Sequence, residues 1–397
     1  MRQQLKSVWY FQTDKEIDKL DSQINKKYCG IETKDGCRFL FAYHLPEQET
    51  SSNKHFVAFA EIARRLKRTI VLTNVGRSRI RWDRMLPFEF YYDVETLQKK
   101  FPDVRFITQE EFRKWTKERY NKPNAIHARI ERLEPINVEK FVKPDFGALK
   151  KMKRFDFAFD NSSAFLQLNI GDDSSWMTGE GNRNMLNFLT TTLNSKAEVV
   201  LLVHDRKFLI ETTNPVPYAK HLTNAAEKVI KKLDKYIAIH WRMERGEVAM
   251  MPECAKRLVV YLERLASKTG INNIYLATDY PLLQKPQSDT FHKLGDEHHQ
   301  AMKILNSSFH LNTWVSTHSL DYLKEYTDLA KPLEDELAGG GLQGILDKLI
   351  LINANYFISG SKGCCRIRSK YTLRVAEERK RLFKKGTVRI KNIIDRW

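Results

Sequence analysis

The feature that most constrains the fold is an alternation of short apolar segments with segments of helical periodicity. In the N-terminal half, the apolar segments are residues 38–43 (RFLFAY), 69–75 (TIVLTNV), 104–108 (VRFIT) and 199–203 (VVLLV). Between the first two, residues 56–66 place apolar side chains at helical spacing. Strands that alternate with helices imply parallel sheets covered on both faces, which predicts an α/β fold.

The C-terminal half repeats this alternation more regularly. Strands are expected at residues 236–240, 274–277, 314–316 and 356–358, and helices at residues 222–233, 252–268, 342–353 and 371–383. Pro252 stands in the first turn of one helix and Gly270 follows its end, as start and stop signals predict. In such folds, ligands bind beyond the carboxyl ends of the strands and often between domains.

We therefore expect two Rossmann-like, doubly wound domains that face a cleft. An N-terminal extension of residues 1–30 precedes them. Residues 31–225 form the first domain, and residues 226–397 form the second.

The net charge favours anionic partners. Lys and Arg number 67 against 49 Asp and Glu, a formal charge of +18, and residues 362–397 hold 13 basic against 3 acidic residues. Such an excess suits nucleic acid, membrane phosphates or a nucleotide diphosphate. A basic nucleic-acid-binding protein is one alternative. No recognisable nucleic-acid module appears, however, and the charge lies largely beside a candidate diphosphate site, so we expect no nucleic-acid partner.

The cysteines and the N-terminus bear on metal binding and on the compartment. None of the five cysteines forms a CxxC pair and no His stands near them at zinc spacing, so we expect no metal site; a Cys29–Cys37 disulfide stays open. Residues 1–20 resemble neither a signal peptide nor an anchor, and no run of about 18 apolar residues occurs, so we expect no transmembrane segment. The protein is then cytosolic, or its native N-terminus lies outside this sequence.

The strand expected at residues 236–240 runs directly into the charged segment 240–247 (HWRMERGE). The Arg242 guanidinium can hold a phosphate through two parallel hydrogen bonds with a charge that does not titrate. His240 can donate to the same group. A structural ion pair of Arg242 with Glu244 or Glu247 explains the pattern equally well.

Two later strands also end in polar residues. Residues 274–279 (IYLATD) end in Asp279, which can accept hydrogen bonds from a base or a ribose, or can cap the following helix. Residues 356–379 lead from a strand to Ser369 and Thr372 at the start of a basic helix, where N–H groups and hydroxyls form an anion site or a plain capped turn. The GxxxxGK[ST] order of a P-loop is absent.

The first strand ends in an acidic loop. His44-Leu45-Pro46 leads into Glu47 and Glu49, and Asn53 follows before the first helix. Either carboxylate is a candidate general base, although most surface carboxylates take no part in chemistry.

Taken together and in order, these strand ends resemble the GDP-fucose protein O-fucosyltransferase superfamily. That superfamily has a strand ending in HxR, a later strand ending in ATD, and a C-terminal FIG…SxFSxRIxEER segment. The counterparts here are residues 240–242 (HWR), 277–279 (ATD), 357–358 (FI) and 369–379 (SKYTLRVAEER). Residues 60–72 (AEIARRLKRTIVL) fit the helix-to-strand step of the superfamily, and Asn53 falls where the superfamily has its Asn.

The resemblance implies a GT-B-like fold with GDP-fucose as donor, no cofactor, and an inverting transfer without an essential metal. Arg242 would bind the β-phosphate and help the diphosphate leave, His240 would support the nucleotide, and Asp279 would contact the base or ribose. The remaining donor-binding residues would be Asn53, Ser369, Lys370 and Thr372. The acceptor would be a protein Ser/Thr or a glycan, in the ER or Golgi lumen.

The sequence departs from the superfamily at two places. The loop glycines before Asn53 are replaced by residues 48–52 (QETSS), and residues 363–368 (GCCRIR) form an insertion. The departures leave open a relative that binds sugar nucleotide without turnover. A glycan α1,6-type fucosyltransferase is a further alternative, but such enzymes resemble HxRR, and Met243 replaces the second Arg.

Overall fold

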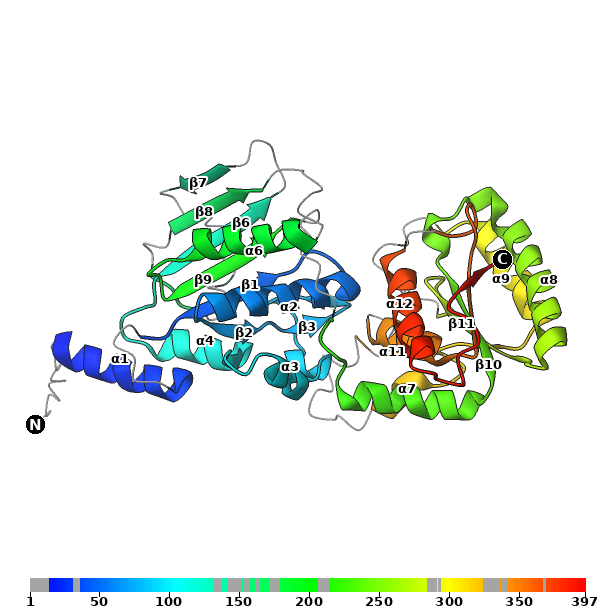
Figure 1. Cartoon of the computed structure of the whole chain (residues 1–397), viewed down its shortest axis with the longest axis horizontal. Helices are drawn as coiled ribbons and strands as arrows, with labels where there is room; N and C mark the ends of the chain where they lie inside the picture. Colours follow the sequence, from blue (N-terminus) through cyan, green and yellow to red (C-terminus); the bar gives the residue numbers. More distant parts are fainter. Residues whose placement is uncertain are drawn as a thin grey trace, which may run out of the picture.

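The chain folds into two α/β halves, each built on its own sheet (Figure 1). This computed structural model describes residues 14–30, 36–131, 137–141, 152, 157–160, 164–170, 179–205, 214–283, 291, 294–323, 336, 341–366 and 369–397. The expected α/β architecture with two largely parallel sheets is confirmed. No helix in the described part of the chain is both long and apolar enough to cross a membrane.

The first half contains a seven-stranded sheet in the order β5-β2-β1-β9-β6-β8-β7. Its described strand pairs are all parallel except β7 with β8 at one edge. The strands are β1 (Phe39–His44), β2 (Thr69–Leu72), β5 (Phe106–Thr108), β6 (Ala125–Glu131), β7 (Asn137–Phe141), β8 (Ala164–Asn169) and β9 (Val199–His204), with a separate hairpin of β3 (Val75–Gly76) and β4 (Arg79–Ile80). The helices are α1 (Asp14–Cys29), α2 (Glu49–Arg65), η1 (Phe88–Phe90), α3 (Val94–Lys100), α4 (Gln109–Glu118) and α6 (Gly179–Leu193).

The inner strand β1 is buried on both faces, and its side chains alternate between two cores. Leu40 and Ala42 belong to the core that includes the apolar face of α2, whereas Phe39 and Phe41 pack edge-on against Phe112 of α4. Because successive strand residues point to opposite faces, a near-continuous apolar strand can fill two helix-covered cores.

The second half contains the all-parallel sheet β12-β11-β10-β13-β14. Its strands are β10 (Tyr236–Trp241), β11 (Asn273–Thr278), β12 (Leu311–Asn312), β13 (Tyr356–Ser359) and β14 (Asp395–Arg396). Its helices are α7 (Lys220–Leu233), η3 (Met243–Arg245), η4 (Val248–Met250), α8 (Met251–Thr269), α9 (Asp296–Ser308), η5 (Ser319–Leu323), α11 (Leu342–Asn353) and α12 (Lys370–Lys384). Helices α7, α11 and α12 lie on one side of β10 and β11, and α8 and α9 lie on the other (Figure 1).

Several expectations need correction in detail. The expected strand 314–316 is wrong, because Ser316 Oγ accepts from Thr313 N at 2.8 Å and closes a turn there; the strand is β12, just before it. Helix α2 begins at Glu49 instead of residue 56. The expected domain boundary at 225/226 falls inside α7, a helix that packs against α11 of the second half.

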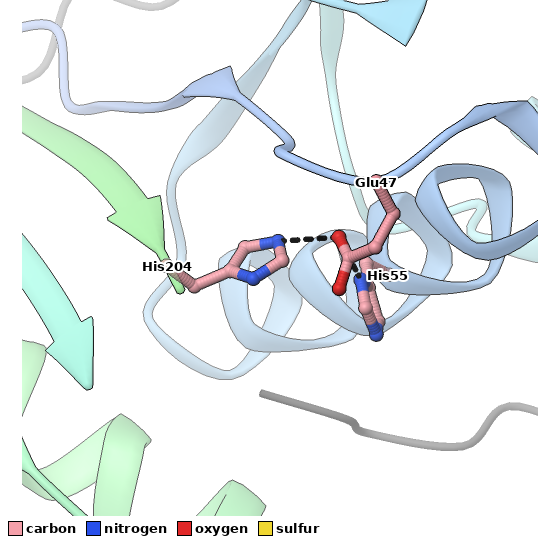
Figure 2. Close-up of side chains that lie close together, drawn as sticks. All are labelled: Glu47, His55 and His204. Atoms are coloured by element: carbon pink, nitrogen blue, oxygen red, sulfur yellow. Dashed lines mark ion pairs between the residues drawn. The ribbon is translucent and has the colours of Figure 1, made fainter. Parts of the chain in front are cut away.

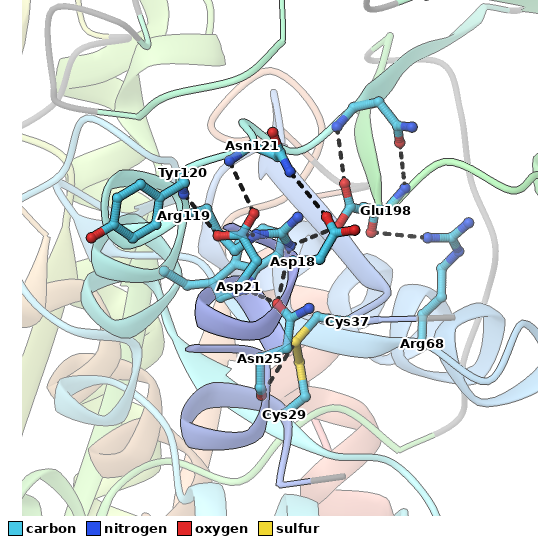
Figure 3. A network of polar contacts seen from close by, with 12 residues as sticks. Asp18, Asp21, Asn25, Cys29, Cys37, Arg68, Arg119, Tyr120, Asn121 and Glu198 are labelled. Carbon is cyan, nitrogen blue, oxygen red and sulfur yellow. Dashed lines mark hydrogen bonds and ion pairs between the residues drawn. A yellow bond between two sulfur atoms is a disulfide. The ribbon is translucent and has the colours of Figure 1, made fainter. Parts of the chain in front are cut away.

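Residues of the expected N-terminal extension form α1, which is fastened to the first half (Figure 3). A disulfide joins Cys29 at its end to Cys37 before β1. Asp21 accepts backbone hydrogen bonds from Tyr120 and Asn121 at 2.8 and 3.0 Å. Asp21 also pairs with Arg119 at 3.2 Å, and Arg119 in turn reaches Glu198 at 2.7 Å. One buried acid, one half-buried acid and the guanidinium they share therefore hold α1 against the end of α4 and the start of β9.

Candidate functional site

The predicted donor residues gather at the carboxyl edge of the second sheet. The ends of three adjacent parallel strands meet there, because His240 of β10 pairs in register with Ala277 of β11 and with Ser359 of β13. In a doubly wound sheet this edge is where ligands bind.

His240 and Thr372, far apart in sequence, are in contact. His240 Nδ1 lies 2.8 Å from the Thr372 hydroxyl, and the His240 ring lies 4.8 Å from the Tyr371 ring. Burial, helped by the Arg242 charge, lowers the pKa of His240 to about 3. The imidazole is therefore neutral at neutral pH and can donate only one hydrogen bond.

Arg242 is ion-paired with Glu244, which is the alternative that the sequence left open. Its Nε donates to Glu244 Oε1 at 2.6 Å and its Nη2 contacts the same oxygen. The Arg242 side chain is 20% exposed, whereas that of Glu244 is 1% exposed. Glu244 thus holds the guanidinium at the strand end while part of the guanidinium remains open to a ligand.

Asp279 supports the loop that follows β10. Its carboxylate accepts from the backbone N–H groups of Met243 and Glu244 at 2.7 and 3.1 Å. It therefore caps η3 and not a helix after itself. Burial raises the pKa of Asp279 to about 6, although the two amides act against the shift. A contact to a base or ribose would add to this structural role.

The start of α12 supplies the remaining donor candidates. Ser369 is the N-cap residue and its hydroxyl accepts from Thr372 N. Lys370 is exposed in the first turn, so its ammonium can reach an anion at the helix N-terminus. The predicted insertion at 363–368 is a loop in its described part. The Cys254–Cys364 disulfide ties it to α8, and Trp241 Nε1 donates to Cys364 O at 2.9 Å.

Glu49 lies at the contact between the two halves, in a network that the sequence did not predict. Lys348 Nζ of α11 lies 2.5 Å from Glu49 Oε2, and the Tyr218 hydroxyl donates to Glu49 Oε1 at 2.9 Å. Burial would raise the pKa of Glu49, but the Lys348 ammonium and these hydrogen bonds bring it below its ordinary value. Burial lowers the pKa of Lys348 despite Glu49. Lys348 and Glu49 form a buried ion pair, in which burial disfavours both charges and each charge stabilises the other.

Asn53 faces the segment between the halves. Its amide nitrogen donates to Val216 O at 3.0 Å and its oxygen accepts from Val216 N at 2.7 Å. Its amide nitrogen also lies 3.4 Å from Glu49 Oε1, so the remaining capacity for a donor contact is the second lone pair of the amide oxygen.

Glu47, the second predicted base, lies elsewhere, between His55 of α2 and His204 at the end of β9 (Figure 2). The three side chains are 11%, 1% and 0% exposed. Sequence reasoning missed both histidines. His204 had a usable signal, because it directly follows the apolar segment 199–203, as His240 follows 236–239.

Comparison with known proteins identifies the family. The family described as GDP-fucose protein O-fucosyltransferase matches residues 52–380, and no curated protein matches. Among solved structures, POFUT1 in complex with GDP-fucose is 16% identical, covering 88% of this chain and 95% of that chain, with a TM-score of 0.48. The fucosyltransferase NodZ from Bradyrhizobium is 10% identical, covering 86% of this chain and 92% of that chain, with a TM-score of 0.41.

The matched span contains the HWR, ATD and SKYTLRVAEER segments that carried the resemblance, which is thereby confirmed. The span also covers most of both halves. The chain belongs to the GDP-fucose protein O-fucosyltransferase family and is a glycosyltransferase.

Proposed function

We propose that this protein transfers fucose from GDP-fucose, with inversion, to a protein Ser/Thr or a glycan acceptor. The family match over residues 52–380 carries the proposal. The contact of His240 with Thr372 beside the α12 N-terminus supports it, because it places neutral donors and a helix N-terminus at one strand edge.

The departing diphosphate would be neutralised by protein groups without a metal on the phosphates. Arg242 would bind the β-phosphate, with Lys370 and the first-turn amides of α12 beside it; Ser369 and Thr372 line the same turn. Preorganised charge of this kind stabilises a leaving group because it needs no reorganisation during the reaction. His240 would support the nucleotide, and Asp279 the base or ribose; Asn53 would join the donor site through its amide oxygen.

The two predicted bases differ in availability. Glu49 would have to give up its ion pair with Lys348 to accept a proton. No described residue other than Glu47 itself, through its backbone amide, donates a hydrogen bond to the Glu47 carboxylate. We therefore propose Glu47 as the carboxylate on the acceptor side and Glu49 as the residue that fixes the loop before α2.

The compartment would be oxidising. There are two disulfides in the described part of the chain: Cys29–Cys37 joins the end of α1 to the segment before β1, and Cys254–Cys364 joins residues 110 positions apart in the sequence. Disulfides persist in secretory compartments and are rare in the cytosol. This supports the ER or Golgi lumen.

Calorimetry with GDP, GDP-fucose, UDP and ADP tests the proposal. We expect the two guanosine compounds to bind and UDP and ADP to bind at least about tenfold more weakly, a difference of about 1.4 kcal/mol. Equal affinities for all four would remove the donor assignment. Tight GDP-fucose binding without release of GDP in the presence of acceptor glycoproteins would instead identify a relative that binds without turnover.

A further inference from the structure

Glu47, His55 and His204 converge on one point at the carboxyl edge of the first sheet (Figure 2). One ligand atom from each residue lies within 4.8 Å of the other two. His55 Nδ1 is 3.4 Å and His204 Nε2 is 3.8 Å from Glu47 Oε2. Two atoms bound tetrahedrally to one Zn²⁺ at about 2.1 Å stand about 3.4 Å apart, so the two distances from Glu47 Oε2 equal or come near the spacing of two ligands on one ion.

The tautomer of His204 is determined by its neighbour. His204 Nδ1 lies 2.7 Å from the backbone oxygen of Asp205, which can only accept, so Nδ1 carries the proton. The lone pair of Nε2 then points toward Glu47. Metal-binding histidines are typically oriented by such a hydrogen bond from the other ring nitrogen. Burial lowers the pKa of both His55 and His204 to about 3, which keeps the imidazoles neutral, as ligation requires.

A positively charged partner would stabilise the buried Glu47 carboxylate at this point. Apart from its own backbone amide, no described residue donates a hydrogen bond to the Glu47 carboxylate, and its Oε2 faces the Nε2 lone pair of His204. Lys370 exerts its charge on Glu47 and on His55, but its side chain is exposed and makes no ion pair with Glu47 among the described contacts. A buried carboxylate without a donor or counter-ion is costly. A shared proton or a bound cation would remove this cost.

We propose that Glu47, His55 and His204 bind one divalent transition-metal ion, with Zn²⁺ as the ion that this nitrogen and oxygen donor set suits best. The site would join the loop after β1, helix α2 and the end of β9. This revises the expectation, drawn from the sequence, that the protein holds no metal.

The inference rests on the cluster's geometry, and only its consequence rests on the proposed transfer reaction. With the ion bound, Glu47 is a ligand and not a free base. The donor site in the second half would be unaffected.

Metal binding by the full chain is the direct test. We expect about one equivalent of zinc after equilibration and removal of excess, and a tetrahedral absorption spectrum when Co²⁺ replaces zinc. Glu47→Gln and His204→Gln should each weaken binding about tenfold or more, whereas His127→Gln, which changes a buried histidine outside the cluster, should not. The Co²⁺ spectrum of the unmodified chain decides the question even if a variant fails to fold.

Two results would overturn the site. One is a wild-type chain that retains no zinc and gives no tetrahedral Co²⁺ spectrum, which would leave a shared proton at Glu47. The other is equal zinc affinity in the wild type and both cluster variants. Guanosine nucleotide binding, measured on the same samples, fails or succeeds independently and so separates this inference from the proposed donor.

Discussion

At the scale of single residues, Arg242 combines a structural role with a proposed catalytic role. Arg242 is proposed to hold a phosphate but is also the counter-ion of Glu244, whose side chain is 1% exposed. Removing one partner of a buried pair leaves the other charge uncompensated, at a cost of about 3–5 kcal/mol. A simple Arg242→Ala change therefore tests stability and catalysis at once.

A matched pair of variants separates the two tasks of Arg242. Glu244→Gln removes the buried charge and keeps the guanidinium, and Arg242→Ala/Glu244→Gln removes both. We expect the single variant to retain transfer and the double variant to lose about 10²–10³ in rate, because only the latter lacks the phosphate-binding cation. Equal kcat/KM for GDP-fucose in these two variants would exclude the proposed role.

At the scale of elements, α11 places a carboxyl group inside the core. The charged residues of α11 are Asp347 and Lys348, in an otherwise largely apolar sequence. The Tyr275 hydroxyl of β11 donates to Asp347. Burial raises the pKa of Asp347 to about 7. Between pH about 4 and 7 the folded chain thus binds more protons than the unfolded chain, so its free energy of unfolding falls as pH rises.

Asp347→Asn should remove this pH dependence. The amide oxygen can still accept from Tyr275, but no buried charge forms above pH 7. We expect the variant to equal the wild type near pH 4 and to exceed it by up to about 4 kcal/mol at pH 8. Urea denaturation at both pH values measures the difference. Asp103→Asn, at an exposed position, serves as the control. If the free energy of unfolding of Asp347→Asn changed with pH as much as that of the wild type, the assignment to Asp347 would be wrong.

The attachment of α1 depends on one buried guanidinium. Arg119→Leu should lower the free energy of unfolding by about 3 kcal/mol, because Asp21 and Glu198 lose their shared cation. Arg113→Leu, inside α4 and in a surface pair with Glu110, should cost less than about 1 kcal/mol. Hydrogen exchange across residues 14–29 should accelerate in the first variant alone. Equal protection in both would show that the disulfide and the contacts of Lys27 and Tyr28 with Glu118 hold α1 without Arg119.

At the scale of the whole molecule, ion pairs join the two halves beside an apolar cluster that includes residues of both. Glu49 of α2 pairs with Lys348 of α11, and Lys54 of α2 lies 3.8 Å from Glu377 of α12. The first pair is buried, with side chains 6% and 2% exposed, whereas Glu377 is 55% exposed. The buried pair should therefore dominate the coupling between the halves.

A double-mutant cycle measures that coupling. Lys348→Met should lower the free energy of unfolding by about 3–5 kcal/mol, because Glu49 stays buried without its cation. Adding Glu49→Gln should recover part of the loss. Lys54→Met, which removes the exposed pair, should cost under about 1 kcal/mol. Additive effects of the Lys348 and Glu49 changes would mean that the pair does not join the halves.

Much of the framework could be predicted from the sequence because it depends on local pattern. The strands around residues 38–43, 199–203 and 236–240 and the helix ending at Gly270 follow from apolar periodicity and from stop signals that act over a few residues. The prediction was incomplete: α1, α3, α4, β6 and α9 were not expected, and residues 314–316 form a turn.

What the sequence by itself determined was the α/β alternation, the family, and the strand ends from which His240, Arg242 and Asp279 emerge. Only the tertiary structure decided which side chains meet: His240 with Thr372, Glu49 with Lys348, and Glu47 with His55 and His204. The physical reason is distance along the chain. Periodicity acts within one element, whereas these partners are brought together by strand order and packing that no local pattern encodes.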